Sequence, residues 1–383
     1  MSRRLVILTE IISPYRIPLF NALAAHAEIG LHVIFLSETD PSLRQWQVYK
    51  EEIRFSYEVL PSWRTRIGRY NVLLNSGLGR ALKLAAPHGM LCGGYSYLAS
   101  WQALVWTRAR STPFLLWSES NLQDARRGHA PVEFLKDQFL GQCTAFVVPG
   151  QSAGEYLRSR KIGGERIFTA PNAVENDFFA AAAANARANA AQIRSQLGLP
   201  DRYFLFAGRL VPEKGIFDLL AAYAKLDDPL RRQFGLVFVG DGPSRRALED
   251  RAAAVVPGMI RFAGFAQREQ LTKYYSLAET LILPTYTDTW GLVVNEAMAS
   301  GLPVILSRAA GCASDLVQDG CNGLLVPPGD VAALASAMNR LAQQPQLCKT
   351  MGARNVERIA HYSPAAWAEG IVRAVETIRG EGD

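Results

Sequence analysis

The feature that most constrains the fold is a regular alternation of apolar strands with helical stretches along the chain. In the first half, the apolar runs read RLVILT, LHVIFLS, GMLCGG, PFLLWS and TAFVVPG. The second half repeats the scheme with YFLFAG, FGLVFVG, IRFAGF, TLILPT and LPVILS. Continuous apolar strands joined by helical crossovers form parallel sheets that are covered on both faces. The sequence therefore predicts an α/β protein with two doubly wound, Rossmann-like domains.

An Ala-rich stretch marks the expected boundary between these domains. PNAVENDFF leads into AAAAANARANAAQIRSQLG, whose Ala content favours a helix that opens the second domain. We expect an N-terminal domain over residues 1–175 and a C-terminal domain over residues 176–361. Residues 362–383 are expected to form an amphipathic helix that packs on either domain, with a return to the N-terminal one as the candidate. Ligands of open α/β sheets bind beyond the carboxyl ends of the strands, which favours a cleft between the domains.

The composition narrows the class of protein. Hydrophobic residues make up 49% and charged residues 20%, so the chain buries large cores and is not disordered. The net charge of +6 suits anionic partners such as nucleotides, nucleic acid or a membrane surface, although a mildly basic soluble protein is equally compatible. We expect no secretion signal, no membrane-spanning helix and reduced cysteines, hence a cytoplasmic protein. The His and Cys residues have no metal-ligand spacing, so no metal is expected.

A basic pair follows the first strand of the second half, in YFLFAGRLVPEKGIFDLL. Arg209 leaves the carboxyl end of the strand, and Lys214 precedes Gly215 at the start of the next helix. A cation at a helix N-terminus opposes the helix dipole unless an anion lies between them. Arg and Lys together suit a diphosphate. The alternative is a solvated basic loop in which Glu213 is the internal partner.

Two acids stand in TYTDTWGLVVNEAMASGLPVI. Asp288 lies in a loop after the strand TLILPT, and Gly291 opens a helix whose free N–H groups can bind an anionic group. Glu296 falls in the second turn, on the face that carries Leu292 and Val293. A carboxylate on an apolar face must be hydrogen-bonded, and a ribose diol supplies two donors. The turn at Phe265 offers a resting place for a base, but a core Phe is the commoner interpretation.

The ordered set FAGRLVPEKG, VGDGPSRRAL, PTYTDTWGLVVNEAMASGLPVI and NGLLVPPGD resembles the retaining glycosyltransferases of family four, which have the GT-B fold. ISPYRIPLFNALA, FVVPGQSAGEYL and APNAVENDFF fit the family too, so the resemblance covers most of the chain. It implies transfer of a hexose from a nucleotide diphosphate sugar to a hydroxyl of a glycan or lipid-linked acceptor, with retention and without a metal. The implied setting is cell-surface polysaccharide, lipopolysaccharide or glycolipid assembly.

The resemblance also implies roles for single residues. Arg209 and Lys214 match the pair that holds the donor diphosphate, and Glu296 matches the ribose ligand. Asp288 takes the place of the acid that contacts the transferred sugar. The other donor-side positions are the helix start and the base-contacting turn: Gly291, Leu292, Val293 and Phe265.

Three departures from the family pattern affect catalysis and the acceptor side. Asp288 is one methylene shorter than the usual Glu. Glu119 in LLWSESN stands where many members carry a catalytic-side His, so its role is open. TEIISPYR replaces a Gly-rich loop and offers Tyr15 and Arg16 to the cleft. The catalytic candidates are therefore Asp288 and Glu119, with the cations Arg209 and Lys214.

Other functions stay open beside this one. An epimerase or sugar phosphorylase would keep the fold, and a non-catalytic bilobal binding protein would keep the architecture. Nucleic-acid binding ranks low because no basic-aromatic repeat or known module is present. Residues 61–83 form either an attachment to an anionic membrane at the inner face or the solvated face of a surface helix. That stretch interleaves aromatic with basic residues: Trp63, Tyr70, Arg64, Arg66, Arg69, Arg80 and Lys83.

Overall fold

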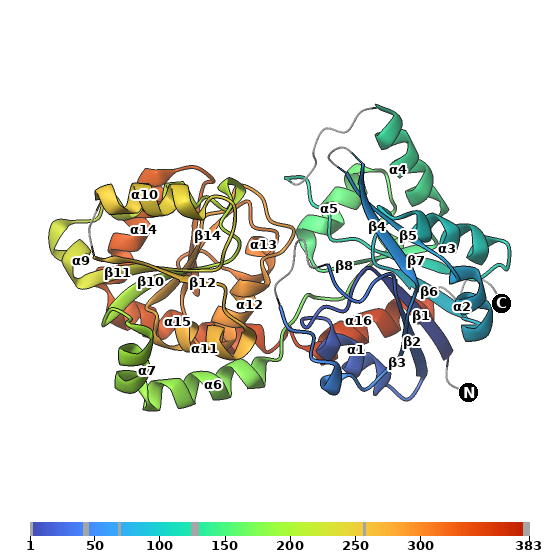
Figure 1. Ribbon diagram of the computed structural model, residues 1–383, viewed down its shortest axis with the longest axis horizontal. Coiled ribbons are helices and arrows are strands. Elements are labelled where there is room, and N and C mark those ends of the chain that lie inside the picture. Colours follow the sequence, from blue (N-terminus) through green and yellow to red (C-terminus); the bar gives the residue numbers. More distant parts are fainter. Residues whose placement is uncertain (1–2, 41–45, 68–69, 124–129, 256–257, 378–383) are drawn as a thin grey trace. The chain divides into compact units, whose positions relative to one another are not determined.

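Figure 1 shows the computed structural model, which describes residues 3–40, 46–67, 70–123, 130–255 and 258–377. The chain divides into two compact units. The first unit comprises the residues up to Asn172 and those from Pro364 onward. The second unit comprises Ala173–Ser363.

The first unit is built on a parallel seven-stranded sheet in the order β3-β2-β1-β6-β7-β8-β9. Its strands are β1 (Arg3–Thr9), β2 (Ile29–Phe35), β3 (Ser56–Val59), β6 (Gly89–Cys92), β7 (Phe114–Trp117), β8 (Ala145–Val148) and β9 (Ile167–Thr169). An antiparallel pair, β4 (Ser62–Ile67) and β5 (Tyr70–Asn75), stands apart from this sheet. The helices are α1 (Ile17–Ala24), α2 (Leu78–Ala85), α3 (Leu98–Arg108), α4 (Ala130–Gln142), α5 (Gln151–Ser159) and α16 (Pro364–Thr377), with short 3-10 turns at Lys50–Glu52 and Gly164–Arg166.

The second unit is built on a parallel six-stranded sheet in the order β12-β11-β10-β13-β14-β15. Its strands are β10 (Arg202–Ala207), β11 (Phe234–Val239), β12 (Ile260–Gly264), β13 (Thr280–Leu283), β14 (Val304–Ser307) and β15 (Gly323–Val326). The first helices are α6 (Asn176–Ala188), α7 (Ala190–Leu197), the 3-10 turn η3 (Pro212–Lys214), α8 (Ile216–Ala224), α9 (Asp228–Gln233) and α10 (Arg245–Val255). They are followed by α11 (Arg268–Leu277), α12 (Leu292–Ala299), α13 (Ala313–Leu316), α14 (Val331–Gln343) and α15 (Pro345–Ile359).

All ten strands expected from the apolar runs are present, and the α/β class with two Rossmann-like domains is confirmed. The central strands are buried on both faces, as β11 is at every residue. This double burial is why their sequences are continuous apolar runs rather than alternating ones. The strands that the sequence did not reveal are short or lie at sheet edges and in the hairpin: β3, β4, β5, β9 and β15.

The Ala-rich stretch forms two helices rather than one. Helix α6 begins at Asn176, within PNAVENDFF and before the Ala-rich run, and Asn189 separates it from α7. Residues Phe179, Ala183 and Ala186 of α6 are buried. The small Ala side chains therefore allow α6 to pack closely, chiefly against α11.

Helix α16 belongs to the first unit, where it lies beside α1 (Figure 1). Trp367 at its start is fully buried, with its ring centroid 5.2 Å from that of Trp117 and 5.7 Å from that of Phe20. The sequence left open which domain this helix joins, because its apolar face could pack against the core of either domain.

Residues 61–83 do not form the surface helix considered above. They fold into the β4–β5 hairpin and the start of α2. Trp63 is 63% exposed and stands opposite Leu74, which is 37% exposed. The hairpin thus presents an apolar outer surface. Arg69 and the side chains of Arg66 and Tyr70 lie outside the described residues.

Candidate functional site

A close approach between two loops organises the site in the second unit. Gly215 has φ 67° and caps α8, and a Cβ there would clash with the carbonyl oxygen of Pro284. The backbone oxygen of Glu213 accepts hydrogen bonds from the Tyr286 N–H at 2.8 Å and the Thr285 hydroxyl at 3.0 Å. Only glycine fits such a contact. The loop after β10 is thereby fixed against the loop after β13.

This contact brings Lys214 onto Asp288. The Lys214 ammonium donates to Oδ2 of Asp288, and the two side chains are 22% and 15% exposed. The alternative of a basic loop with Glu213 as the internal partner does not hold, because the loop packing places the lysine beside the later acid. Asp288 is itself held by its Oδ1, which accepts from the Trp290 N–H at 3.3 Å.

Arg209 lies on the same edge, directly after β10 and Gly208. Its side chain is exposed, and no described acidic residue forms an ion pair with it. It is therefore a cation available to a ligand, whereas Lys214 already has a partner.

The start of α12 adjoins the ion pair. Gly291 adopts φ 98° and caps the helix without a side-chain hydrogen bond. An added Cβ at Gly291 would lie 3.6 Å from Oδ2 of Asp288. Helix geometry leaves the N–H groups of Leu292 and Val293 without an intrahelical acceptor. The arrangement thus combines a lysine, a carboxylate and a helix N-terminus at one point.

Glu296 is buried further along α12, with 1% of its surface exposed. The Tyr275 hydroxyl on α11 donates to its Oε2 at 2.6 Å. Burial raises the pKa of the Glu296 carboxyl to about 7, and the hydrogen bond from Tyr275 works in the opposite direction. The sequence correctly indicated that this carboxylate needs a donor, but it did not reveal Tyr275. Nothing in LTKYYSLAE distinguishes Tyr275 from Tyr274.

Phe265 follows β12 and is 39% exposed. The interpretation as a core residue is therefore wrong, because the chain turns at Gly264, with φ 75°, before the side chain can enter the core.

The acceptor-side candidates lie in the first unit. Arg16 precedes α1, and its guanidinium stacks on the Trp117 ring at 4.2 Å, donates to the Thr9 hydroxyl at 3.0 Å and lies 3.7 Å from Glu119. The carboxyl ends of β1 and β7 thus bring Arg16 and Glu119 together. Tyr15 instead packs edge-on against Trp46, with centroids 5.8 Å apart.

A second charged cluster on the first unit was not foreseen. Arg64 of β4 donates to Asp40 at 2.7 Å and to Glu10 at 3.4 Å, and Asp40 is only 2% exposed. Glu10 directly follows β1. The hairpin is therefore fastened to the chain beyond β1 and β2 by a partly buried ion pair.

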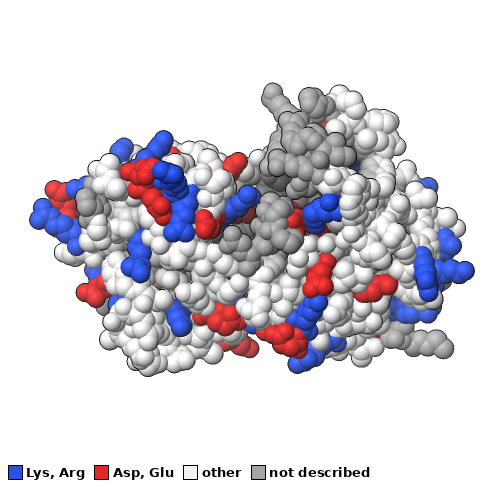
Figure 2. Space-filling view, in the orientation of Figure 1, with Lys and Arg blue, Asp and Glu red and all other residues white. Residues whose placement is uncertain are grey.

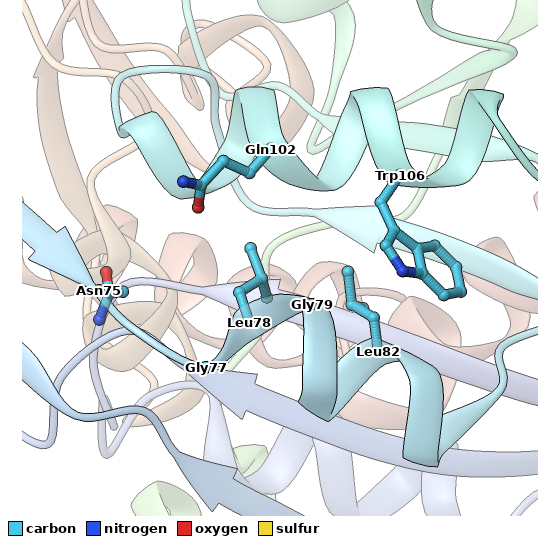
Figure 3. Close-up of a pocket in the computed structure, with 7 residues that line it drawn as sticks. All are labelled: Asn75, Gly77, Leu78, Gly79, Leu82, Gln102 and Trp106. Carbon is cyan, nitrogen blue, oxygen red and sulfur yellow. The ribbon is translucent and has the colours of Figure 1, made fainter.

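A cavity of about 260 Å³ lies between α2 and α3 (Figure 3). Gln102 and Trp106 project from α3 toward Leu78 and Leu82 of α2, and Asn75 lies at one end. The remaining lining residues are Gly77 and Gly79. None of the sequence-predicted site residues lines this cavity.

Among the described residues, charges of both signs are spread over the face shown in Figure 2. None of the helices in the described ranges is both long and apolar enough for a membrane crossing. Within the same ranges, no group of three or more His, Cys, Asp or Glu side chains is placed to hold a metal ion.

Residues 189–358 match the family model of Glycosyl transferases group 1. The D-inositol 3-phosphate glycosyltransferase of Frankia alni is 36% identical over 196 residues, which cover 48% of this chain and 48% of that relative. This chain thus spans about half the length of the curated relatives it matches.

Two solved structures are similar over nearly the whole chain. Anabaena HepE in complex with UDP-glucose has a TM-score of 0.76 at 16% identity, over 97% of this chain and 99% of that one. Sucrose-phosphate synthase from Thermosynechococcus elongatus has a TM-score of 0.74 at 23% identity, over 99% and 100%. At these identities the likeness shows a common fold, the GT-B fold. The match to the Glycosyl transferases group 1 model thus falls entirely within the second unit, Ala173–Ser363.

Proposed function

We propose that this protein is a retaining glycosyltransferase that moves a hexose from a nucleotide diphosphate sugar to an acceptor hydroxyl. The proposal rests on one observation. Lys214 and Asp288 form an ion pair beside the start of α12, within the segment that matches Glycosyl transferases group 1. HepE was solved with UDP-glucose, and the Frankia relative is named for a glycosyl transfer.

The chemistry follows from where charge develops during the reaction. As the bond to the donor sugar breaks, the sugar becomes oxocarbenium-like and negative charge builds on the departing diphosphate. Arg209, Lys214 and the free N–H groups at the start of α12 stabilise that charge. In this role Lys214 exchanges part of its contact with Asp288 for the phosphate, which leaves Asp288 to accept a hydroxyl of the sugar.

The other candidates complete the donor and acceptor sides. Glu296 accepts hydrogen bonds from the nucleotide ribose, and the exposed Phe265 contacts the base. We extend the proposal to retention through same-face attack assisted by the leaving phosphate. In the first unit, Glu119, held by Arg16, assists the acceptor hydroxyl.

We further propose a role in cell-surface polysaccharide, lipopolysaccharide or glycolipid assembly, with peripheral attachment to an anionic membrane. The supporting observation is the exposed apolar surface of the hairpin at Trp63 and Leu74, in a chain of net charge +6. An exposed aromatic side chain suits the interface of a bilayer, and a net positive charge favours an anionic one.

The test is a thermal-shift screen with nucleoside diphosphates and nucleotide sugars, followed by a transfer assay. We expect at least one nucleotide diphosphate sugar to raise the melting temperature, because ligand binding to the native state stabilises it. Glycoside formation should then require an added hydroxyl acceptor. Absence of any nucleotide effect overturns the proposal, and epimerised or phosphorolysed donor without an acceptor assigns a different reaction.

A further inference from the structure

Tyr275 is buried against the carboxylate proposed to bind the ribose. Its ring is fully enclosed, and its hydroxyl lies 2.6 Å from Oε2 of Glu296. A carboxylate in an apolar environment is costly unless it is hydrogen-bonded, and bonds to an ionised acceptor are short and strong. Within the described residues, Tyr275 is the only side chain that hydrogen-bonds this carboxylate.

The other elements packed on α12 direct their charges elsewhere. Arg187 of α6 donates to the carbonyl oxygens of Ser276 and Ser300, at 3.2 and 2.5 Å. Arg358 of α15 donates to the carbonyl oxygen of Asp315. Strands β13 and β14, with the sequences TLIL and VILS, carry no titratable side chain. Besides burial, Tyr275 is therefore the influence that sets the state of Glu296.

We propose that Tyr275 is a positioning residue of the donor site, which holds Glu296 ionised and oriented for the nucleotide ribose. The hydroxyl binds Oε2 and leaves Oε1 to accept from the ribose diol. This inference rests on the proposed function, because it takes the ribose as the ligand of Glu296.

A dependence on pH follows from this role. Burial raises the pKa of Glu296 to about 7, so the carboxylate that accepts from a diol is lost as the pH falls through that value. The Tyr275 hydroxyl opposes the effect of burial. Without it the pKa of Glu296 rises further, and ribose binding needs a higher pH.

The experiment measures nucleotide affinity by calorimetry from about pH 5.5 to about pH 9, a range that brackets the Glu296 midpoint. The probes are whichever of UDP, GDP and ADP binds most tightly and its 2′,3′-dideoxy form. Tyr275→Phe should weaken binding of the ribonucleotide by roughly tenfold at pH 7, as expected for a lost bond to a charged acceptor, with partial recovery at high pH. The dideoxynucleotide should be affected little by the substitution.

Two further variants make the test specific. Tyr274→Phe changes another buried tyrosine on the same helix, so it should keep the wild-type pH profile. Glu296→Gln should leave only the pH dependence that the dideoxynucleotide also shows, which comes from the second ionisation of the phosphate at about pH 6. A wild-type midpoint in Tyr275→Phe, or equal losses for both nucleotides at every pH, overturns the inference and leaves Tyr275 a structural role. If the wild-type protein binds none of the nucleotides, both the proposed function and this inference are refuted.

Discussion

Two kinds of charged residue make up the proposed donor site. Lys214 and Asp288 form a partly exposed ion pair between the loops after β10 and β13. Glu296 is instead buried and accepts a hydrogen bond from Tyr275. A partly exposed pair remains accessible, so a ligand phosphate can replace one of its partners. A buried carboxyl instead responds to pH, because its surroundings disfavour the charged form.

Removal of either cation should weaken nucleotide binding. We expect Arg209→Ala and Lys214→Ala each to raise the Kd for a nucleoside diphosphate by roughly 10- to 100-fold, the usual range for a lost bond between charged groups. Transfer activity should fall at least as much, because the leaving-group charge is stabilised by the same cations. Isothermal calorimetry and initial rates measure both effects. Lys225→Ala, an exposed lysine in the same unit, is the control and should bind as the wild type does.

Glu296 should make the stability of the second unit depend on pH. Its pKa rises from 4.5 to about 7 on folding, so the native state binds the proton more tightly. The stability that it contributes is complete below its unfolded pKa and is lost as the pH rises through about 7. The free energy of unfolding should therefore fall by up to about 3 kcal/mol between about pH 4.5 and 8.

Urea unfolding of the second unit at several pH values measures this slope. Glu296→Gln should flatten it, because the amide does not titrate. Glu357→Gln changes an exposed carboxyl on α15 and should leave the slope in place. An unchanged slope in Glu296→Gln would show that other groups govern the pH dependence.

At the scale of the elements, the loops that follow β10 and β13 form the candidate site. The β4–β5 hairpin forms a separate, exposed apolar surface. The two strands are neighbours in one parallel sheet, so their carboxyl ends meet at one edge. This adjacency brings residues 74 positions apart in the chain into an ion pair. The hairpin is held by Arg64 on Asp40 and Glu10, which leaves its outer face free.

The hairpin should contribute to attachment to anionic membranes. We expect Trp63→Ala to reduce sedimentation with vesicles that contain phosphatidylglycerol by about tenfold, because a buried aromatic side chain is worth on the order of 1.5–3 kcal/mol. High salt should weaken binding of the wild type as well. Val356→Ala, an exposed apolar residue of the second unit, serves as the control. Wild-type protein that stays in the supernatant at low salt would refute the membrane proposal.

At the scale of the whole molecule, the first unit includes a helix from a distant segment of the chain. After the second unit is complete, α16 returns to pack on α1, β8 and β9. Its buried Trp367 lies against Phe20 and Trp117. Trp117 also carries the stacked Arg16, so this core supports a residue proposed for the acceptor side.

Loss of the Trp367 side chain should destabilise the first unit alone. Trp367→Ala removes a large buried ring, for which about 3–5 kcal/mol is usual. Hydrogen exchange followed by mass spectrometry should show faster exchange in β1, α1 and β7. Peptides from β10 to β14 should keep their protection. Trp367→Phe retains most of the volume and should restore much of the protection in the first unit.

The sequence alone singled out Lys214, Asp288 and Gly291, which the structure brings together, and its failures have identifiable causes. Glu296 could be recognised because a carboxylate among Leu292, Val293 and Ala299 is chemically out of place. Sequence adjacency suggested only Glu213 as an internal partner for Lys214, because Asp288 is 74 positions away. The hairpin was missed because Trp63 and Leu74 break the expected pattern with outward-facing apolar residues.

The sequence by itself determined the two Rossmann-like domains, their central strands and the side chains that can meet an anionic ligand. These follow from local patterns, namely apolar runs, glycine turns and charges placed after strands. Only the tertiary structure decided that Lys214 pairs with Asp288, that the Tyr275 hydroxyl donates a hydrogen bond to Glu296 and that α16 packs on the first unit. Each of these depends on contacts between segments far apart in the chain, which sheet order and close packing create and which no local pattern specifies.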